Sequence, residues 1–168
     1  KLVDEFLGLA FHNQHGLPVI VVRLFNTVGP RQVGHYGMVI PRFVSQAMEN
    51  LPITVYGDGE QSRCFCNVED TVEALIRLTE NDNCIGEVFN IGSSEEISIV
   101  DLANQIKKIT NSSSEITFTP YEEAYSDGFE DMRRRIPDTQ KIQKFTEWKS
   151  TIPLNETIES VWGHLSKN

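Results

Sequence analysis

The order of apolar and polar positions predicts helices alternating with strands. Apolar residues recur at helical spacing over residues 2–15, and Gly16 is placed to end that helix. After Pro18, the apolar run at 19–22 is continuous and β-branched, which is typical of a strand buried on both faces of a parallel sheet. A helix, a short loop and a buried strand make half of a βαβ unit, and a parallel strand needs parallel neighbours. The pattern therefore predicts an α/β chain that opens within a larger sheet, as a fragment would.

The same periodicities place further elements after residue 28. A helix that begins with proline, a short strand ended by a Gly-Asp-Gly turn and a short extended segment are predicted at 41–49, 53–56 and 64–68. A helix over 70–78 has Asp70 as its N-cap or first-turn carboxylate, and a strand at 88–92 returns to the parallel sheet. The remaining elements are a helix 99–109 capped by Ser98, a strand 116–118, an exposed acidic loop 121–131, and helices at 137–145 and from 154 to near 165.

Composition describes an acidic globular chain. Its 168 residues are 39% hydrophobic and 23% charged, and 15 basic against 24 acidic side chains give a formal charge of −9. An acidic body does not attract nucleic acid or an anionic membrane, so neither is expected as the main partner. Without a long apolar run or a signal peptide, the cytoplasm is the expected compartment. Cys64, Cys66 and Cys84 have no metal-ligand spacing, and no metal site is predicted.

Residues 23–32, Arg-Leu-Phe-Asn-Thr-Val-Gly-Pro-Arg-Gln, are the strongest indication of a binding site. The strand runs directly into a polar turn, and ligands of α/β proteins bind at the carboxyl ends of strands. The amide of Asn26 has both a donor and an acceptor, which suits a phosphate oxygen or a sugar hydroxyl. A simple turn asparagine is the alternative.

Two arginine-containing segments that are distant in sequence are candidates for binding phosphate. Arg63 follows the Gly-rich turn, and residues 133–135 form the one dense basic run. A guanidinium presents a planar fork of donors to a diphosphate and stays charged at every relevant pH. The alternative for the basic run is a solvated loop that balances the acidic residues before it.

These segments, with Val-Tyr-Gly-Asp-Gly-Glu-Gln-Ser-Arg at 55–63, resemble the second half of an extended short-chain dehydrogenase/reductase of the NAD-dependent epimerase/dehydratase family. The resemblance implies the C-terminal part of a Rossmann-type α/β fold, with its last parallel strands and a small α/β substrate-binding domain. Residues 1–27 would end the NAD-binding domain. Residues 28–168 would mainly bind the nucleotide sugar, with 68–92 returning to the Rossmann sheet.

The resemblance also implies an activity on UDP- or dTDP-sugars. The intact enzyme would oxidise the sugar transiently at C4 with NAD, most like a UDP-sugar 4-epimerase; a UDP-glucuronate decarboxylase and a dTDP-glucose 4,6-dehydratase are the alternatives. The chain has no G-x-x-G-x-x-G loop, so NAD would be bound mainly by a preceding half, and the 168 residues alone are expected to be inactive. The family commonly dimerises through the helix that corresponds to 2–15. An alternative of another class is a non-catalytic nucleotide-binding or dimerisation module.

Residue roles follow from the same resemblance. Lys1 matches the lysine of Tyr-x-x-x-Lys, which binds the nicotinamide ribose and lowers the tyrosine pKa; a solvated terminal lysine is the alternative. Phe25 and Val28 would lie near the nicotinamide, and Asn26 would reach the substrate. Arg63 and Arg135 would clamp the diphosphate, with Arg134 as the second choice for Arg135.

The resemblance also implies a pocket for the base between two segments of the chain. Its predicted residues are Val39, Ile40 and Arg42 at the start of a helix, and Thr54 and Tyr56 on a strand. Tyr56 could stack on uracil or thymine, or could simply be a core residue. Asn67 stands where the family usually has tyrosine, which leaves the packing there open.

Overall fold

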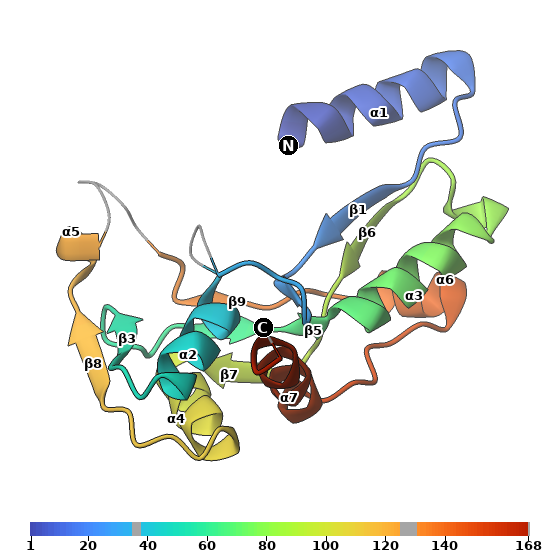
Figure 1. Cartoon of the computed structure of the whole chain (residues 1–168). Helices are drawn as coiled ribbons and strands as arrows, with labels where there is room; N and C mark the ends of the chain where they lie inside the picture. The colour runs from blue at the N-terminus through green and yellow to red at the C-terminus, as the bar shows by residue number, and fades with distance from the viewer. Residues whose placement is uncertain (35–37, 125–130, 168) are drawn as a thin grey trace.

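The computed structural model describes residues 1–34, 38–124 and 131–167 and shows helices packed on short, mostly parallel strands (Figure 1). In chain order the elements are α1 (Leu2–His15), β1 (Val21–Leu24), β2 (Thr27–Val28), α2 (Val39–Met48), β3 (Ile53–Tyr56), β4 (Ser62–Cys64), β5 (Cys66–Asn67), α3 (Val68–Thr79), a 3-10 turn (Asp82–Cys84), β6 (Val88–Ile91), β7 (Glu96–Ser98), α4 (Ile99–Ile109), β8 (Ile116–Thr119), α5 (Tyr121–Ala124), β9 (Arg134–Arg135), α6 (Gln140–Thr146) and α7 (Leu154–Leu165).

The strand pairs confirm the predicted parallel α/β class. β1 pairs with β6, β2 with β5 and β3 with β8, all in parallel. β4 lies between β7, which is antiparallel to it, and β9, which is parallel. The strand predicted at 88–92 does pair with β1, whereas the division into domains at residue 28 stays a prediction.

The prediction that the first strand is buried on both faces is wrong for the described chain. β1 begins at Val21, where pairing with β6 starts, and Arg23 and Leu24 are exposed. Among the described residues, β1 pairs along one edge alone. The β-branched composition of a strand therefore does not by itself establish that both of its faces are covered.

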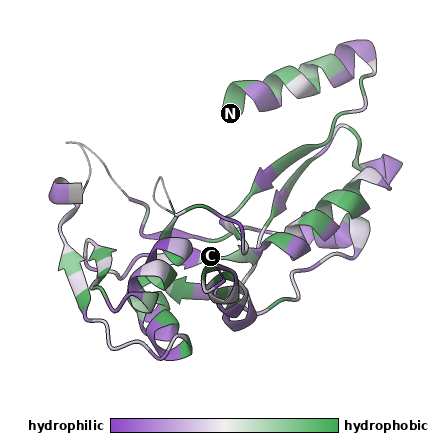
Figure 2. Cartoon of the chain, viewed as in Figure 1, coloured by the Kyte–Doolittle hydropathy of each residue, from purple (hydrophilic) through white to green (hydrophobic). Residues whose placement is uncertain are grey.

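The apolar side chains form two cores. The first core lies among α2, β3, α4 and α7, with Phe43, Leu102 and Ile158 fully buried. The second core lies among β6, α3 and α6, and includes Phe89 and Trp148. Figure 2 shows apolar residues along α3 and α7 as well as on α1, which stands apart from both cores. No residue of α1 is buried.

A buried carboxylate connects the two cores. Asp70 lies in the first turn of α3, is 6% exposed and accepts hydrogen bonds from the backbone N–H of Thr151, the hydroxyl of Thr151 and the backbone N–H of Ile152, each at 3.0 Å. The indole of Trp148 donates to the carbonyl of Asp70 at 3.0 Å. Three donors compensate the desolvated charge and fix the segment that leads into α7.

Asn67 makes a second connection between α3 and α7. Its side-chain oxygen caps α3 by accepting from the N–H of Glu69 at 2.8 Å, and its amide nitrogen donates to Thr157 of α7 at 3.0 Å. Asn67 is therefore the N-cap, and Asp70 takes the first-turn position. Both the oxygen and the nitrogen of the asparagine that departs from the family pattern therefore have a hydrogen-bond partner.

Several other helix and strand boundaries differ from the predicted ones by a few residues. The helix expected at 41–49 begins at Val39, so Pro41 falls within its first turn, and the helix expected from Pro137 begins at Gln140. Position 65 separates β4 from β5, which pair with different strands. The acidic segment expected as an exposed loop contains α5, whose Tyr121 is half-buried; residues 125–130 of that segment lie outside the described residues.

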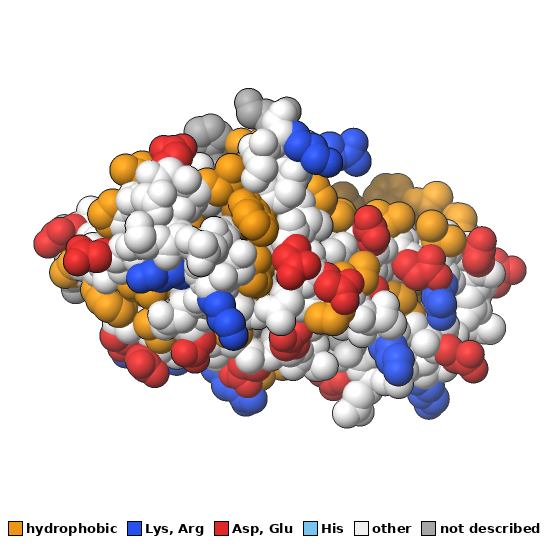
Figure 3. All heavy atoms as spheres, turned by 60° about the horizontal axis from the view of Figure 1, so that its bottom comes forward, with side chains coloured by type: hydrophobic (Ala, Val, Ile, Leu, Met, Phe, Trp, Pro, Cys, Tyr) orange, Lys and Arg blue, Asp and Glu red, His pale blue; other side chains and the backbone are white. Residues whose placement is uncertain are grey.

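The surface carries both charges intermixed. On the face in Figure 3, basic side chains are scattered among acidic ones and form no continuous basic patch. Each helix in the described ranges is too short or too polar to span a bilayer.

Replacing Asp70 by alanine should lower the free energy of unfolding by roughly 3 kcal/mol, because two part-buried backbone N–H groups lose a charged acceptor. Asp70→Asn should cost less, since one oxygen still accepts. Urea denaturation followed by circular dichroism measures both, with Glu69→Ala, which changes an exposed carboxylate one residue away, as the control. An Asp70→Ala midpoint equal to that of the control would contradict this account of how the cores are joined.

Candidate functional site

A small cavity of about 220 Å³ lies where the ends of several strands meet the starts of helices. It is lined by Asn26, Val39, Arg42, Tyr56, Gln61, Arg63, Phe65, Ile99, Tyr121 and Asp131. Five of these residues were predicted site residues that are distant in sequence: Asn26, Val39, Arg42, Tyr56 and Arg63. Five of the ten residues that line the cavity are therefore positions that the sequence analysis predicted as site residues.

Arg63 is the most confined cation of the cavity. It lies on β4 with 12% of its side chain exposed, and its Nη1 donates to the carbonyls of Ser62 and Met132 at 2.7 Å each. Its Nη2 forms an ion pair with Asp131, whose side chain is 27% exposed. These contacts hold the guanidinium in one orientation at the cavity.

Asn26 is both a turn residue and a cavity residue. Its φ of +37° lies in the left-handed region, which asparagine tolerates better than most residues. Its Nδ2 donates to the carbonyl of Cys64 at 2.8 Å, and its own carbonyl accepts from the N–H of Cys66 at 3.1 Å. These bonds tie the end of β1 to β4 and β5, and so fix the amide at the cavity wall.

Arg42 covers Tyr56. The guanidinium carbon lies 4.3 Å from the centre of the Tyr56 ring and 5.1 Å from that of Phe43. A cation at this distance from an aromatic face is attracted by the ring quadrupole. The face of Tyr56 that was predicted to stack on a base is thus in contact with Arg42.

Gln61, Tyr121 and Asp131 form a hydrogen-bonded chain that the prediction missed. Gln61 donates through Nε2 to the carbonyl of Tyr56 at 3.1 Å and to the hydroxyl of Tyr121 at 2.7 Å. Tyr121 in turn donates to Oδ2 of Asp131 at 3.1 Å. The chain links Tyr56 to the ion pair of Arg63.

The glycine at position 57 was the one feature of the sequence that could have indicated an aromatic ring such as Tyr121 packed at this turn. Gly57 has a φ of +70°, and a Cβ atom built on it would meet Cε2 of Tyr121 at 2.4 Å. The Gly-Asp-Gly sequence was interpreted as a strand end, but it also leaves room for an aromatic ring from α5. No local pattern indicated Asp131, which lies within an acidic run.

Arg135 lies beside this cavity. It is the register partner of Arg63 across the β4–β9 pair, and its guanidinium carbon is 5.3 Å from the centre of the Phe25 ring. Arg134 bonds to Glu96 at 2.9 and 3.0 Å, and with Ser62 it lowers the pKa of Glu96 to about 2. Arg135 rather than Arg134 is therefore the arginine next to Phe25, although it does not line the small cavity.

The remaining predicted residues lie elsewhere. Ile40 is fully buried in the first core, and Thr54 forms two hydrogen bonds with Gln46, at 3.2 and 3.3 Å. Val28 is buried in the first core, and Lys1 is exposed at the start of α1, away from the cavity.

Burial disfavours ionisation of all three cysteine thiols. Burial raises the pKa of Cys64 to about 11 and also raises the pKa of Cys66 and of Cys84. No group of three or more His, Cys, Asp or Glu residues suited to a metal ion occurs in the part of the chain that the structure describes.

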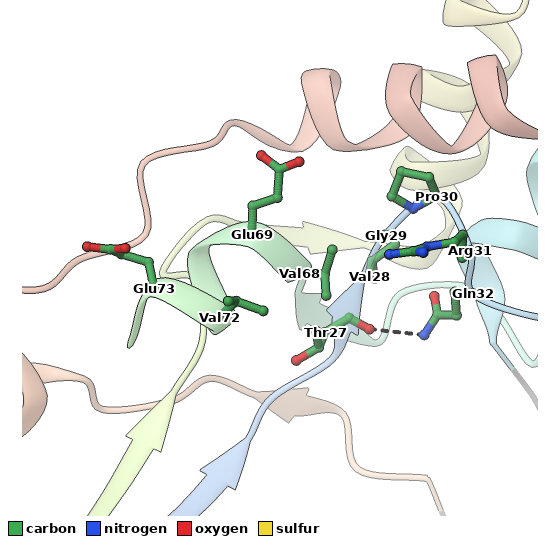
Figure 4. A pocket seen from close by; sticks show the side chains of 10 residues that line it. All are labelled: Thr27, Val28, Gly29, Pro30, Arg31, Gln32, Val68, Glu69, Val72 and Glu73. Carbon is green, nitrogen blue, oxygen red and sulfur yellow. Dashed lines mark hydrogen bonds between the residues drawn. The ribbon is translucent and has the colours of Figure 1, made fainter. Parts of the chain in front are cut away.

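A larger cavity, of about 630 Å³, lies between residues 27–32 and the first turns of α3 (Figure 4). Gly29 approaches Val68 closely there, since a Cβ at position 29 would meet a Val68 methyl at 2.4 Å. Its charged lining residues are Glu69, Glu73 and Arg31, so carboxylates outnumber cations. The smaller cavity, with two arginines and one carboxylate, suits an anionic ligand better.

Comparison with known proteins shows similarity over nearly the whole chain. The family model for GDP-mannose 4,6 dehydratase matches residues 1–161. A UDP-N-acetyl-alpha-D-glucosaminuronate decarboxylase of Bacillus cytotoxicus is 42% identical over 164 residues, which cover 95% of this chain and 50% of the relative. UDP-glucuronic acid decarboxylase 1 of Arabidopsis thaliana is 37% identical over 158 residues, covering 94% and 34%.

Solved structures are similar over the whole chain. UDP-glucuronic acid 4-epimerase from Bacillus cereus, in complex with UDP-glucuronic acid and NAD, has a TM-score of 0.88 and 27% identity, covering 99% of this chain and 51% of that one. UDP-glucose 4-epimerase from Thermotoga maritima, with UDP-glucose, has a TM-score of 0.90 and 27% identity, covering 99% and 52%. The chain spans about half or less of the length of the proteins that it resembles.

Tyr121 provides a spectroscopic test of the site. Burial, then the negative charge of Asp131, raise its pKa to about 12. A raised pKa favours the protonated folded form, so the stability that it contributes is complete below pH 10 and is lost as the pH rises toward 12. Absorbance titration at alkaline pH should show a late phenol component that disappears in Tyr121→Phe, persists in the control Tyr56→Phe, and moves to lower pH in Asp131→Asn. A component unchanged in Tyr121→Phe would rule out this environment.

Proposed function

Because the chain belongs to the GDP-mannose 4,6-dehydratase-like family of NAD-dependent epimerases and dehydratases, we propose that it supplies the nucleotide-sugar-binding half of such an enzyme. The observation that carries the proposal is the cavity that gathers Asn26, Arg42, Tyr56 and Arg63 from four separate segments. Two of these are cations in a chain of charge −9. A locally basic cavity in an acidic body is suited to a small polyanion rather than to a nucleic acid or a membrane surface.

In the proposed complex Arg63 binds the diphosphate. Its guanidinium is oriented by the two backbone carbonyls that it contacts, so little side-chain entropy remains to be lost on binding. Arg135, in register on the next strand, is proposed to contact the same diphosphate or the sugar from the side of Phe25. Asn26 is proposed to bind the sugar side of the ligand through its amide.

The base is proposed to lie against the Arg42 and Tyr56 pair. A guanidinium plane stacks on a pyrimidine as an aromatic ring does, so the contact seen between Arg42 and Tyr56 leaves a stacking surface. Oε1 of Gln61 is buried and has no hydrogen-bond partner among the described residues. It offers an acceptor to an N–H donor such as the imide that uracil and thymine share.

UDP-hexuronates are the substrate class that we propose. The Bacillus cytotoxicus and Arabidopsis relatives are named for decarboxylation of UDP-hexuronates, and the Bacillus cereus structure contains UDP-glucuronic acid. Sequence identity is 37–42% with these decarboxylases and 27% with the two epimerases. These identities favour decarboxylation over the UDP-sugar 4-epimerisation first expected; both reactions would proceed through oxidation at C4.

NAD is expected to be bound mainly outside these residues. Lys1, Phe25 and Val28 were predicted near the cofactor, but no cavity described above is lined by more than one of them. We assign the described residues no step on the cofactor. When bound to the intact enzyme, NAD would supply the hydride acceptor.

Removal of either arginine should weaken UDP binding. Arg63→Ala and Arg135→Ala should each cost about 1.5–3 kcal/mol of binding free energy, because a charge-assisted hydrogen bond to phosphate is lost. Isothermal titration calorimetry with UDP and dTDP measures this, and Arg133→Ala is the matched control, since Arg133 is exposed and pairs with Asp58 at the surface. Unchanged affinity in both variants would remove the diphosphate site from the proposal.

We further propose that the intact enzyme is a homodimer through α1. Leu2, Phe6 and Phe11 are exposed on this helix, and no residue of α1 is buried. Phe6→Asp in the intact protein should shift its mass in solution from dimer to monomer, while His15→Asp near the end of the helix should not. A monomeric parent protein would exclude the dimer.

A further inference from the structure

The proposed diphosphate-binding group already has an anionic partner. Asp131 forms an ion pair with Nη2 of Arg63, and both side chains are largely buried. The carboxylate is held at both ends, because its Oδ1 contacts Arg63 and its Oδ2 accepts from the hydroxyl of Tyr121. Asp131 therefore occupies Nη2 of Arg63, and both residues line the cavity.

The backbone around Asp131 is positioned by the β4–β9 pair. Ser62 is in register with Arg134, and the N–H of Ser62 donates to the carbonyl of Arg133 at 2.9 Å. The carbonyl of Met132 accepts from Nη1 of Arg63 at 2.7 Å. The contacts of residues 132–135 with β4 thus bring the carboxylate of Asp131 to Arg63.

A phosphate and this carboxylate cannot both bind the same N–H donors. If a phosphate approaches Arg63 while Asp131 remains, two anions share one guanidinium in a partly desolvated cavity and repel each other. A carboxylate and a phosphate oxygen suit the guanidinium fork equally well, and a diphosphate brings more charge. Exchange of one anion for the other relieves this conflict.

We propose that Asp131 is an internal competitor for Arg63, which a diphosphate-bearing ligand displaces when it binds. The inference rests on the proposed function, because it takes Arg63 as the diphosphate ligand. Asp131 lowers the apparent affinity for every ligand that uses Arg63 through phosphate. A ligand without phosphate does not contact Arg63, so its affinity does not depend on the Arg63–Asp131 ion pair.

The test compares three probes on the full chain and its variants by calorimetry: inorganic pyrophosphate, UDP and uridine. Asp131→Asn should bind pyrophosphate and UDP about tenfold more tightly than the parent chain, since the competing charge is removed. Uridine affinity should not change. Asp58→Asn is the matched control, because it removes a carboxylate paired with Arg133 outside the cavity and should leave all three affinities within about twofold.

Tyr121→Phe is the second variant and keeps the proposal testable if Asp131→Asn does not fold. Loss of the tyrosine hydroxyl frees Oδ2 of Asp131, so the carboxylate should be displaced more easily and pyrophosphate should bind about two- to threefold more tightly. Circular dichroism of each variant verifies the fold.

Two outcomes would overturn the inference. Equal or weaker binding of pyrophosphate in Asp131→Asn means that the carboxylate does not compete with phosphate. Weaker UDP binding with unchanged pyrophosphate binding means that Asp131 contacts the nucleoside instead. Failure of the proposed function is distinguishable, because UDP binding by the parent chain would then be absent or independent of Arg63.

Discussion

The carboxylate of Asp70 is the interaction on which the arrangement of the two cores depends. It is buried, so its charge is tolerated only because the backbone and hydroxyl of the 151–152 segment compensate it. Those donors lie just before α7, which packs in the first core, while Asp70 lies in the first turn of α3 beside the second. The contacts of Asp70, together with the Asn67–Thr157 hydrogen bond, therefore set where the first core sits relative to the parallel strand pair of β1 and β6.

β4 then places the site on that framework. All three of its residues pair with β7, and Ser62 and Arg63 also pair with β9, although the partners lie more than thirty residues away along the chain. Such pairing brings Arg63 and Arg135 into register and delivers Asp131 to the cavity. The site is thus defined by strand register, and one residue of slippage at β9 would exchange Arg135 for Arg134, which points to the opposite face.

Local patterns predicted much of this fold. The helix at 99–109 and its Ser98 cap match the structure at both ends, since capping and helical periodicity are set by nearby residues. The burial of β1 was wrong because burial depends on neighbours that the pattern of one strand does not specify. Arg63 and Asn26 could be predicted as candidate site residues from the strand and the turn in which they lie. Gln61, Tyr121 and Asp131 reach the cavity through contacts between residues 60 or more positions apart, which no local pattern indicates. Asp131 also lies in a run of acidic residues, from which the sequence alone does not distinguish it.

The unpaired edge of β1 has a consequence for handling the chain in solution. In the described structure four residues of β1 pair with β6 on one side, and Leu24 is exposed beside them. A sheet edge with open backbone donors and acceptors is a template for adding another strand, and neighbouring apolar surface strengthens that association. High concentration of the polypeptide therefore favours aggregation through this edge. A fused partner that supplies a neighbouring strand should improve solubility more than added surface charge would.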